Sequence, residues 1–74
     1  MRILLSSVGR RGYLVKYFKQ AVGNAGEVWG ADSSSYAPAF RYCDHVMLLP
    51  MVGEAGYGDK LLALCRKNKI DMVV

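Results

Sequence analysis

The residues best suited to bind a charged ligand lie near the N-terminus, in the segment Ser-Ser-Val-Gly-Arg-Arg-Gly at residues 6–12. Arg10 and Arg11 carry guanidinium groups, whose forked donors match carboxylates and phosphates. Ser6 and Ser7 add hydroxyl donors. Since this segment follows an apolar strand pattern and precedes a helix pattern, backbone N–H groups at the helix start also favour an anion. The segment predicts a site for a small anionic substrate.

The glycine spacing in this segment does not fit the known nucleotide-binding motifs. Gly9 and Gly12 fail the Gly-x-Gly-x-x-Gly spacing, and no Gly-x-x-x-x-Gly-Lys-Ser/Thr loop occurs in the sequence. Gly9 is nevertheless a candidate for the anion site, because it lies in the predicted strand-to-helix turn. The alternative is that the glycines only turn the chain and the arginines are solvated, since such loops are common in α/β folds.

A second candidate is Asp32, which follows another strand pattern. Dinucleotide-binding folds hold a ribose hydroxyl with an acid at this place, and the spacing from Gly9 is suitable. Ser33 would then belong to the same ligand loop. The alternative is that Asp32 only turns the polar loop over residues 33–36, because aspartate is a favoured turn residue.

Strand and helix patterns alternate along the chain and place both candidate segments. Apolar runs predict four strands, at residues 2–6, 27–31, 45–49 and 70–74. Three helical segments lie between them. The first is amphipathic and ends at Gly23–Gly26, and the second is short and runs from Pro38 to residue 42 or 43. The third is capped by Asp59 and has a core-facing stripe of Leu61, Leu62, Leu64 and Cys65. Such β-α-β alternation predicts a Rossmann-like α/β half with four parallel strands and helices on both faces.

Composition limits the function classes. Of the 74 residues, 53% are hydrophobic and 22% charged, so we expect a folded domain. The net charge is +4, but the basic residues are spread from Arg2 to Lys69, which argues against nucleic acid. Cys43, Cys65 and a single His45 form no zinc motif, and we expect both thiols to be reduced and buried. The N-terminal apolar run is too short for a signal peptide or a membrane span, which predicts a cytoplasmic protein without membrane contact.

Three parts of the sequence together carry a family resemblance. Residues 1–19, with their Ser-x-Gly-Arg-Arg turn, resemble the opening of ATP-grasp proteins related to the large subunit of carbamoyl-phosphate synthase. Asp32, Ala37-Pro38-Ala39, and Cys43-Asp44 before a strand closed by Pro50 are similar to that family's next motifs. Tyr57 to Asp71 resembles its third helix and the Ile-Asp that opens the fourth strand.

The resemblance implies that residues 1–74 are a pre-ATP-grasp domain, the substrate-side subdomain of an ATP-dependent carboxylate–amine or carbamoyl-phosphate synthase-like ligase that acts through an acyl-phosphate. Ser7, Gly9, Arg10 and Arg11 would help to enclose the substrate. ATP and Mg²⁺ are implied for the full-length parent. The lid domain, the ATP-clamping strands and the metal-binding carboxylates have no counterpart here, so we expect this chain to bind no cofactor and to be inactive alone.

Two other hypotheses about the function of the chain remain open. Asp32 fits the dinucleotide-binding half of an NAD(P)-dependent oxidoreductase or a sugar-nucleotide epimerase. A stand-alone small-molecule-binding or dimerisation module is the other alternative, with a homodimer covering the sheet further. Because Val74 falls in the fourth predicted strand, we expect a piece of a longer chain whose remaining ATP-grasp portion is its partner.

Overall fold

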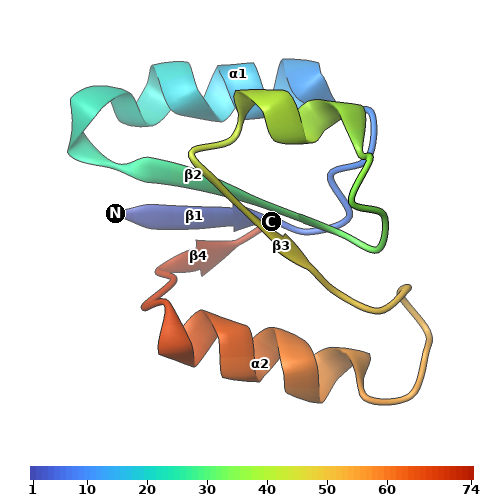
Figure 1. Cartoon of the computed structure of the whole chain (residues 1–74). Helices are drawn as coiled ribbons and strands as arrows, with labels where there is room; N and C mark the ends of the chain where they lie inside the picture. The colour runs from blue at the N-terminus through green and yellow to red at the C-terminus, as the bar shows by residue number, and fades with distance from the viewer.

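The computed structural model describes all 74 residues and contains one four-stranded sheet in which every strand pair is parallel (Figure 1). The strands are β1 (Arg2–Leu5), β2 (Glu27–Asp32), β3 (His45–Leu48) and β4 (Met72–Val73). Their order across the sheet is β3-β2-β1-β4. The chain therefore adds β2 and then β3 on one side of β1 and places β4 on the other side of β1, as in half of a doubly wound fold. The predicted α/β class is confirmed.

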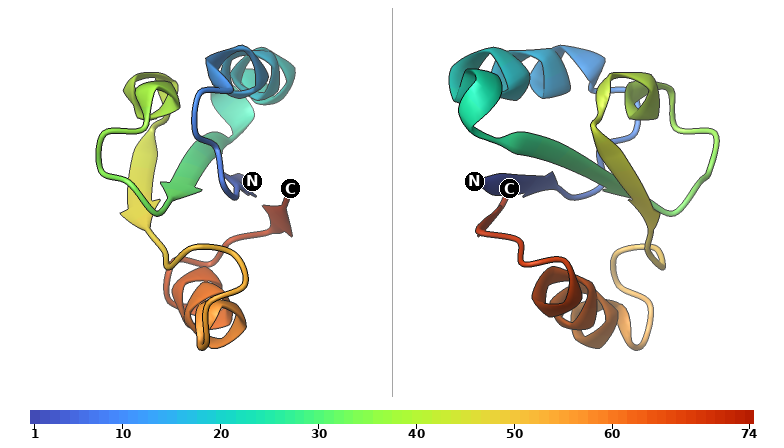
Figure 2. Two further views of the ribbon diagram at one scale, coloured as in Figure 1. Left: turned by 90° about the vertical axis from the view of Figure 1, so that its right-hand side faces the viewer. Right: turned by 60° about the vertical axis from the view of Figure 1, so that its left-hand side comes forward.

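Helices cover both faces of the sheet, as predicted (Figure 2). On one face lie α1 (Gly12–Val22) and the short 3₁₀ helix η2 (Pro38–Tyr42), and on the other lies α2 (Tyr57–Lys67). A second 3₁₀ turn, η1 (Gly23–Ala25), links α1 to β2. None of these helices combines the length and the apolar character that a bilayer crossing needs.

The central strand β1 is buried from both sides, which explains its unbroken run of apolar residues. Ile3 and Leu5 join the core under α1 and η2, while Leu4 faces the opposite core under α2. The core under α1 and η2 contains six buried residues, whereas the one under α2 contains three. The α2 face is thus covered less completely, and no residue of α2 itself is fully buried.

Three predictions about α2 and the cysteines are wrong in detail. Asp59 does not cap the helix, because Gly56 adopts a left-handed conformation (φ 87°) and accepts the N–H of Lys60, so that α2 begins at Tyr57 and Asp59 lies in its first turn. Leu62 was expected in the core stripe, but it is 55% exposed because it faces away from the sheet. Both cysteines are free thiols, as expected, yet they are half-buried instead of buried because each lies at the edge of a core.

Candidate functional site

The turn over residues 6–12 leads from β1 into α1, as the sequence predicted, and its conformation is set by the backbone. Ser7 and Gly9 both have positive φ angles, of 51° and 49°. Between them Val8 is fully buried, and its N–H donates to the carbonyl of Ala31 in β2 at 2.9 Å. This buried anchor fixes the turn against the end of the neighbouring strand.

Several of the predicted anion donors are engaged within the fold. The Arg11 guanidinium donates to the carbonyl oxygens of Ser6 and Ser7, at 3.1 and 2.9 Å. The hydroxyl of Ser6 donates to the carbonyl of Val74 at 2.8 Å. Arg11 and Ser6 therefore stabilise the turn and its neighbour β4. Arg10 is exposed and takes part in none of the hydrogen bonds or ion pairs of the structure, so its guanidinium stays available.

Asp32 joins the two predicted site segments. One of its carboxylate oxygens accepts the N–H of Gly9 at 2.7 Å, and the other accepts the N–H of Ser34 at 3.1 Å. The second bond is the turn-forming role that the sequence left as an alternative. The first bond was not predicted. It occupies one of the backbone N–H groups that an anion could have used.

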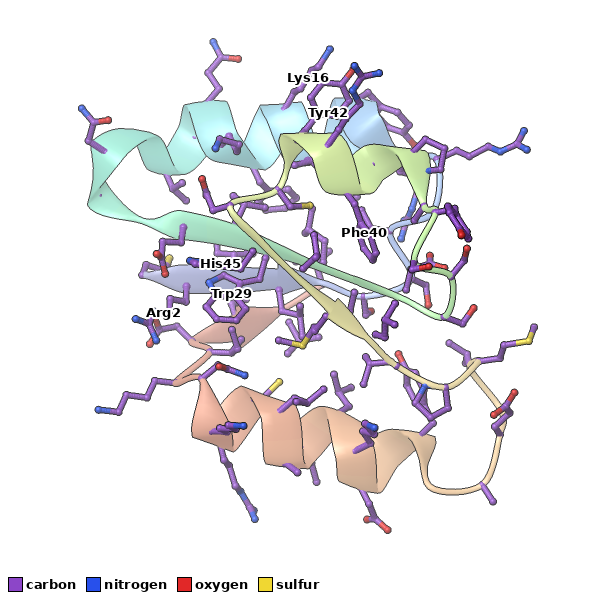
Figure 3. All side chains as sticks on the ribbon, viewed as in Figure 1. Arg2, Lys16, Trp29, Phe40, Tyr42 and His45 are labelled. Carbon is purple, nitrogen blue, oxygen red and sulfur yellow. The ribbon has the colours of Figure 1, made fainter.

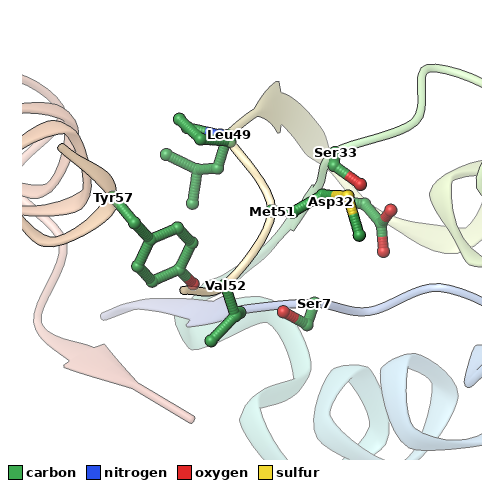
Figure 4. Close-up of a pocket in the computed structure, with 8 residues that line it drawn as sticks. Ser7, Asp32, Ser33, Leu49, Met51, Val52 and Tyr57 are labelled. Atoms are coloured by element: carbon green, nitrogen blue, oxygen red, sulfur yellow. The ribbon is translucent and has the colours of Figure 1, made fainter. Parts of the chain in front are cut away.

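A cleft of about 270 Å³ opens at the carboxyl ends of β1, β2 and β3 (Figure 4). We call it the strand-end cleft, and it is lined by Ser7, Asp32, Ser33, Leu49, Pro50, Met51, Val52 and Tyr57. Open α/β sheets bind their ligands at this edge. The lining contains one carboxylate, hydroxyl groups and apolar walls, but no basic side chain. Of the predicted site residues, the structure brings Ser7, Asp32 and Ser33 to the cleft.

Five of the eight lining residues were not predicted from the sequence. Residues 49–52 follow β3 directly, and Tyr57 opens α2. The rule that ligands lie beyond the carboxyl ends of parallel strands would have identified residues 49–52, because they lie directly beyond the carboxyl end of β3, as Ser33 does beyond that of β2. Tyr57 had no such signal, since its position depends on how the loop after β3 folds back.

The opposite end of the sheet holds a polar cluster around Glu27 (Figure 3). Its carboxylate accepts the indole N–H of Trp29 at 3.2 Å and contacts His45 and Arg2 at 3.2 and 2.9 Å. The hydrogen bonds with Trp29 and His45 lower the pKa of Glu27. Because these residues lie where β1, β2 and β3 begin, the cluster ties the strands together away from the strand-end cleft.

Neither thiol lines the strand-end cleft. Burial raises the pKa of Cys43 and of Cys65, which disfavours their thiolate forms. No three His, Cys, Asp or Glu side chains lie close enough together to hold a metal ion. The single carboxylate of the strand-end cleft accepts one N–H group on each of its oxygens. Binding of a small molecule is what this arrangement can do.

Comparison with known proteins identifies the family. No curated protein matches the chain. The family described as "PylC-like, N-terminal domain" matches residues 3–74, which is almost the entire sequence. That match agrees with the parallel sheet and with the helices on both of its faces. The chain therefore belongs to the PylC-like N-terminal domain family, a family of pre-ATP-grasp domains.

Proposed function

We propose that this chain is the substrate-side subdomain of an ATP-dependent ligase that joins a carboxylate to an amine through an acyl-phosphate. The family match over residues 3–74 is the observation that carries the proposal. The strand-end cleft supports it, since a pre-ATP-grasp domain that helps to enclose a substrate needs such an edge. A relation to the large subunit of carbamoyl-phosphate synthase is part of the same proposal.

The residues of the turn have different roles in this proposal. Arg11 and Ser6 hold the turn in shape through bonds to backbone carbonyls. Ser7 presents its hydroxyl to the strand-end cleft, together with Ser33 on the neighbouring loop. Arg10 supplies the free charge for a carboxylate or phosphate of the substrate. These residues bind and orient, and none of them carries out a chemical step.

ATP and Mg²⁺ would be bound by the remaining ATP-grasp portion of the polypeptide, in the cytoplasm. The strand-end cleft has no basic side chain for a triphosphate, and its single carboxylate belongs to Asp32. The polypeptide partner would close over the cleft and supply the groups that bind ATP and Mg²⁺. We therefore expect this chain alone to show no ATP turnover.

The test is a ligase assay on the polypeptide encoded by the complete reading frame that includes residues 1–74. ADP release should require both a carboxylate and an amine substrate, and Ser7→Ala should raise the KM of one of them several-fold while leaving the KM for ATP unchanged. The variant Lys67→Gln, on the exposed side of α2, is the matched control and should leave both constants unchanged.

Calorimetry on the 74-residue chain provides the second arm. We expect no binding of ATP in the micromolar range, because the strand-end cleft does not suit a triphosphate. Micromolar binding of ATP to this chain would refute the assignment of a purely substrate-side role. Equal ADP release by the complete polypeptide with and without an amine substrate would refute the ligase assignment.

A further inference from the structure

A second cleft lies outside the strand-end cleft, between the start of α1 and η2. Its volume is about 320 Å³. We call it the α1–η2 cleft, and it is lined by Arg10, Gly12, Tyr13, Lys16, Pro38, Ala39, Arg41 and Tyr42. None of these residues lines the strand-end cleft. An inference about this cleft shares only Arg10 with the proposed ligase function and otherwise rests on residues that have no role in it.

Three cations from three different segments meet in the α1–η2 cleft, and the cleft contains no acid. Arg10 comes from the turn, Lys16 from α1 and Arg41 from η2. None of the three forms an ion pair in the structure, whereas Arg2 and Lys19 are paired with Glu27 and Asp44. Since like charges repel each other, this grouping leaves a local excess of positive charge that an anion would neutralise.

The ring of Tyr42 forms a shared surface for two of the cations (Figure 3). The Lys16 ammonium lies 4.3 Å from the ring centroid, and the Arg41 guanidinium carbon lies 5.6 Å from it. Contact with an aromatic face stabilises a cation electrostatically. The ring thus holds both charges at the cleft without neutralising them, and their N–H groups stay free for a ligand.

The cleft is held open by backbone features and does not depend on the cations themselves. A Cβ atom at Gly12 would lie 2.8 Å from a ring carbon of Tyr42, so the ring can approach α1 this closely only because residue 12 is glycine. The N–H of Ala39 donates to the carbonyl of Gly9 at 3.0 Å, which ties η2 to the turn. The ring therefore places Lys16 and Arg41, and the backbone bond places the turn that carries Arg10, before any ligand arrives.

We propose that the α1–η2 cleft binds the phosphate group of a small molecule. Guanidinium forks and an ammonium group are the donors that proteins use for phosphate. The exposed ring of Tyr13 lines the same cleft and offers a surface for an organic group attached to that phosphate. A nucleic acid backbone fits less well, because the adjacent basic residue Lys19 is paired with Asp44 and does not extend the charged strip.

Amide-resolved NMR titration of the 74-residue chain tests this proposal at constant ionic strength. Inorganic phosphate should cause saturable shifts of Gly12, Tyr13 and residues 39–42. Lys16→Gln and Arg41→Gln should each weaken the affinity about two- to fivefold, as expected for single exposed charges, and the double variant roughly tenfold. Lys60→Gln/Lys67→Gln removes the same charge from exposed positions of α2 on the other face and should change the affinity less than twofold.

Phenyl phosphate, as a second probe, distinguishes the sources of the phosphate. Tighter binding than that of inorganic phosphate assigns an organic phosphate, and equal binding assigns the free ion. Both outcomes support the proposal. Chemical shifts that do not saturate with phosphate would overturn it. So would a double variant that binds phosphate as tightly as the unmodified chain and keeps its circular dichroism spectrum. Binding of an oligonucleotide at this cleft, where phosphate does not bind, would overturn it as well.

Discussion

Replacing Gly30 by alanine should destabilise the protein through one identifiable contact. Gly30 is buried in β2, and a Cβ atom built there would lie 2.5 Å from the sulfur of Cys43. Side chains of Phe40 and Val8 lie at 3.5 Å, which is ordinary contact. The glycine at this strand position therefore makes room for the segment between η2 and β3, and through Val8 the same contact region reaches the turn of the candidate site.

Two opposing effects set the size of the loss. Overpacking a core by one methyl group costs about 1–3 kcal/mol, whereas replacing a glycine by alanine at a compatible backbone position gains about 0.4–1 kcal/mol through the unfolded state. The net expectation is a loss of about 1–2 kcal/mol. In a domain of this size each kcal/mol lowers Tm by roughly 4–8 °C, so thermal and urea unfolding, followed by the fluorescence of Trp29, would resolve it.

A double-mutant cycle with Cys43→Ala isolates the cause. Since Cys43→Ala removes the sulfur, Gly30→Ala should cost at least about 1 kcal/mol less in that background, which is the coupling expected of residues in contact. Gly58→Ala is the matched control, because nothing lies within 4 Å of its Cβ position in α2, and it should stabilise by up to about 1 kcal/mol. Additive effects of Gly30→Ala and Cys43→Ala would refute the reasoning.

Three further expectations concern charge and ligand. The hydrogen bond from Lys19, followed by that from the Val28 N–H, lowers the pKa of Asp44, so its stabilisation is present above the ordinary aspartate pKa of about 3.9 and is lost as pH falls through the lowered value. Asp44→Asn should lower the urea midpoint at neutral pH and flatten its acid limb; an unchanged acid limb would contradict this. Asp32→Asn replaces one acceptor of the Gly9 and Ser34 N–H groups by a donor and should cost about 1–2 kcal/mol in urea unfolding. NAD or NADP should leave Tm unchanged, and a rise of several degrees would favour the dinucleotide alternative.

The sequence predicted the order of elements well because each strand and helix has its own local pattern. The apolar run in β1 indicated burial on both faces, and Ile3, Leu4 and Leu5 are indeed buried. The N-cap of α2 was misplaced by three residues, at Asp59 instead of Gly56, since a left-handed Gly56 begins the helix without any capping side chain. Propensity favours Asp59 as a cap, but it does not reveal which nearby glycine adopts a positive φ angle.

The location of the candidate site could be predicted from the sequence, but the hydrogen bonds of its residues could not. The rule for parallel strands identifies the turn after β1 and the carboxyl end of β2, and the structure brings Ser7, Asp32 and Ser33 to one cleft. That Arg11 bonds to the carbonyls of its own turn depends on the positive φ angle of Ser7, which no residue pattern signals. Whether these residues bind a substrate stays a prediction.

The two clefts differ in charge, and the turn over residues 6–12 contributes to both. Ser7 lines the strand-end cleft, whose only charged side chain is an acid, while Arg10 lines the α1–η2 cleft, which holds three bases and no acid. Buried Val8 lies between these two residues in the chain and fixes the turn to β2. The electrostatic potential therefore favours different groups at the two clefts. For a ligand that carries both an amine and a phosphate, the phosphate is favoured at the α1–η2 cleft. The amine, or a neutral group, is favoured at the strand-end cleft. Changes at Ser7 should therefore alter binding at the strand-end cleft and changes at Arg10 should alter binding at the α1–η2 cleft, although only Val8 and Gly9 lie between them in the sequence.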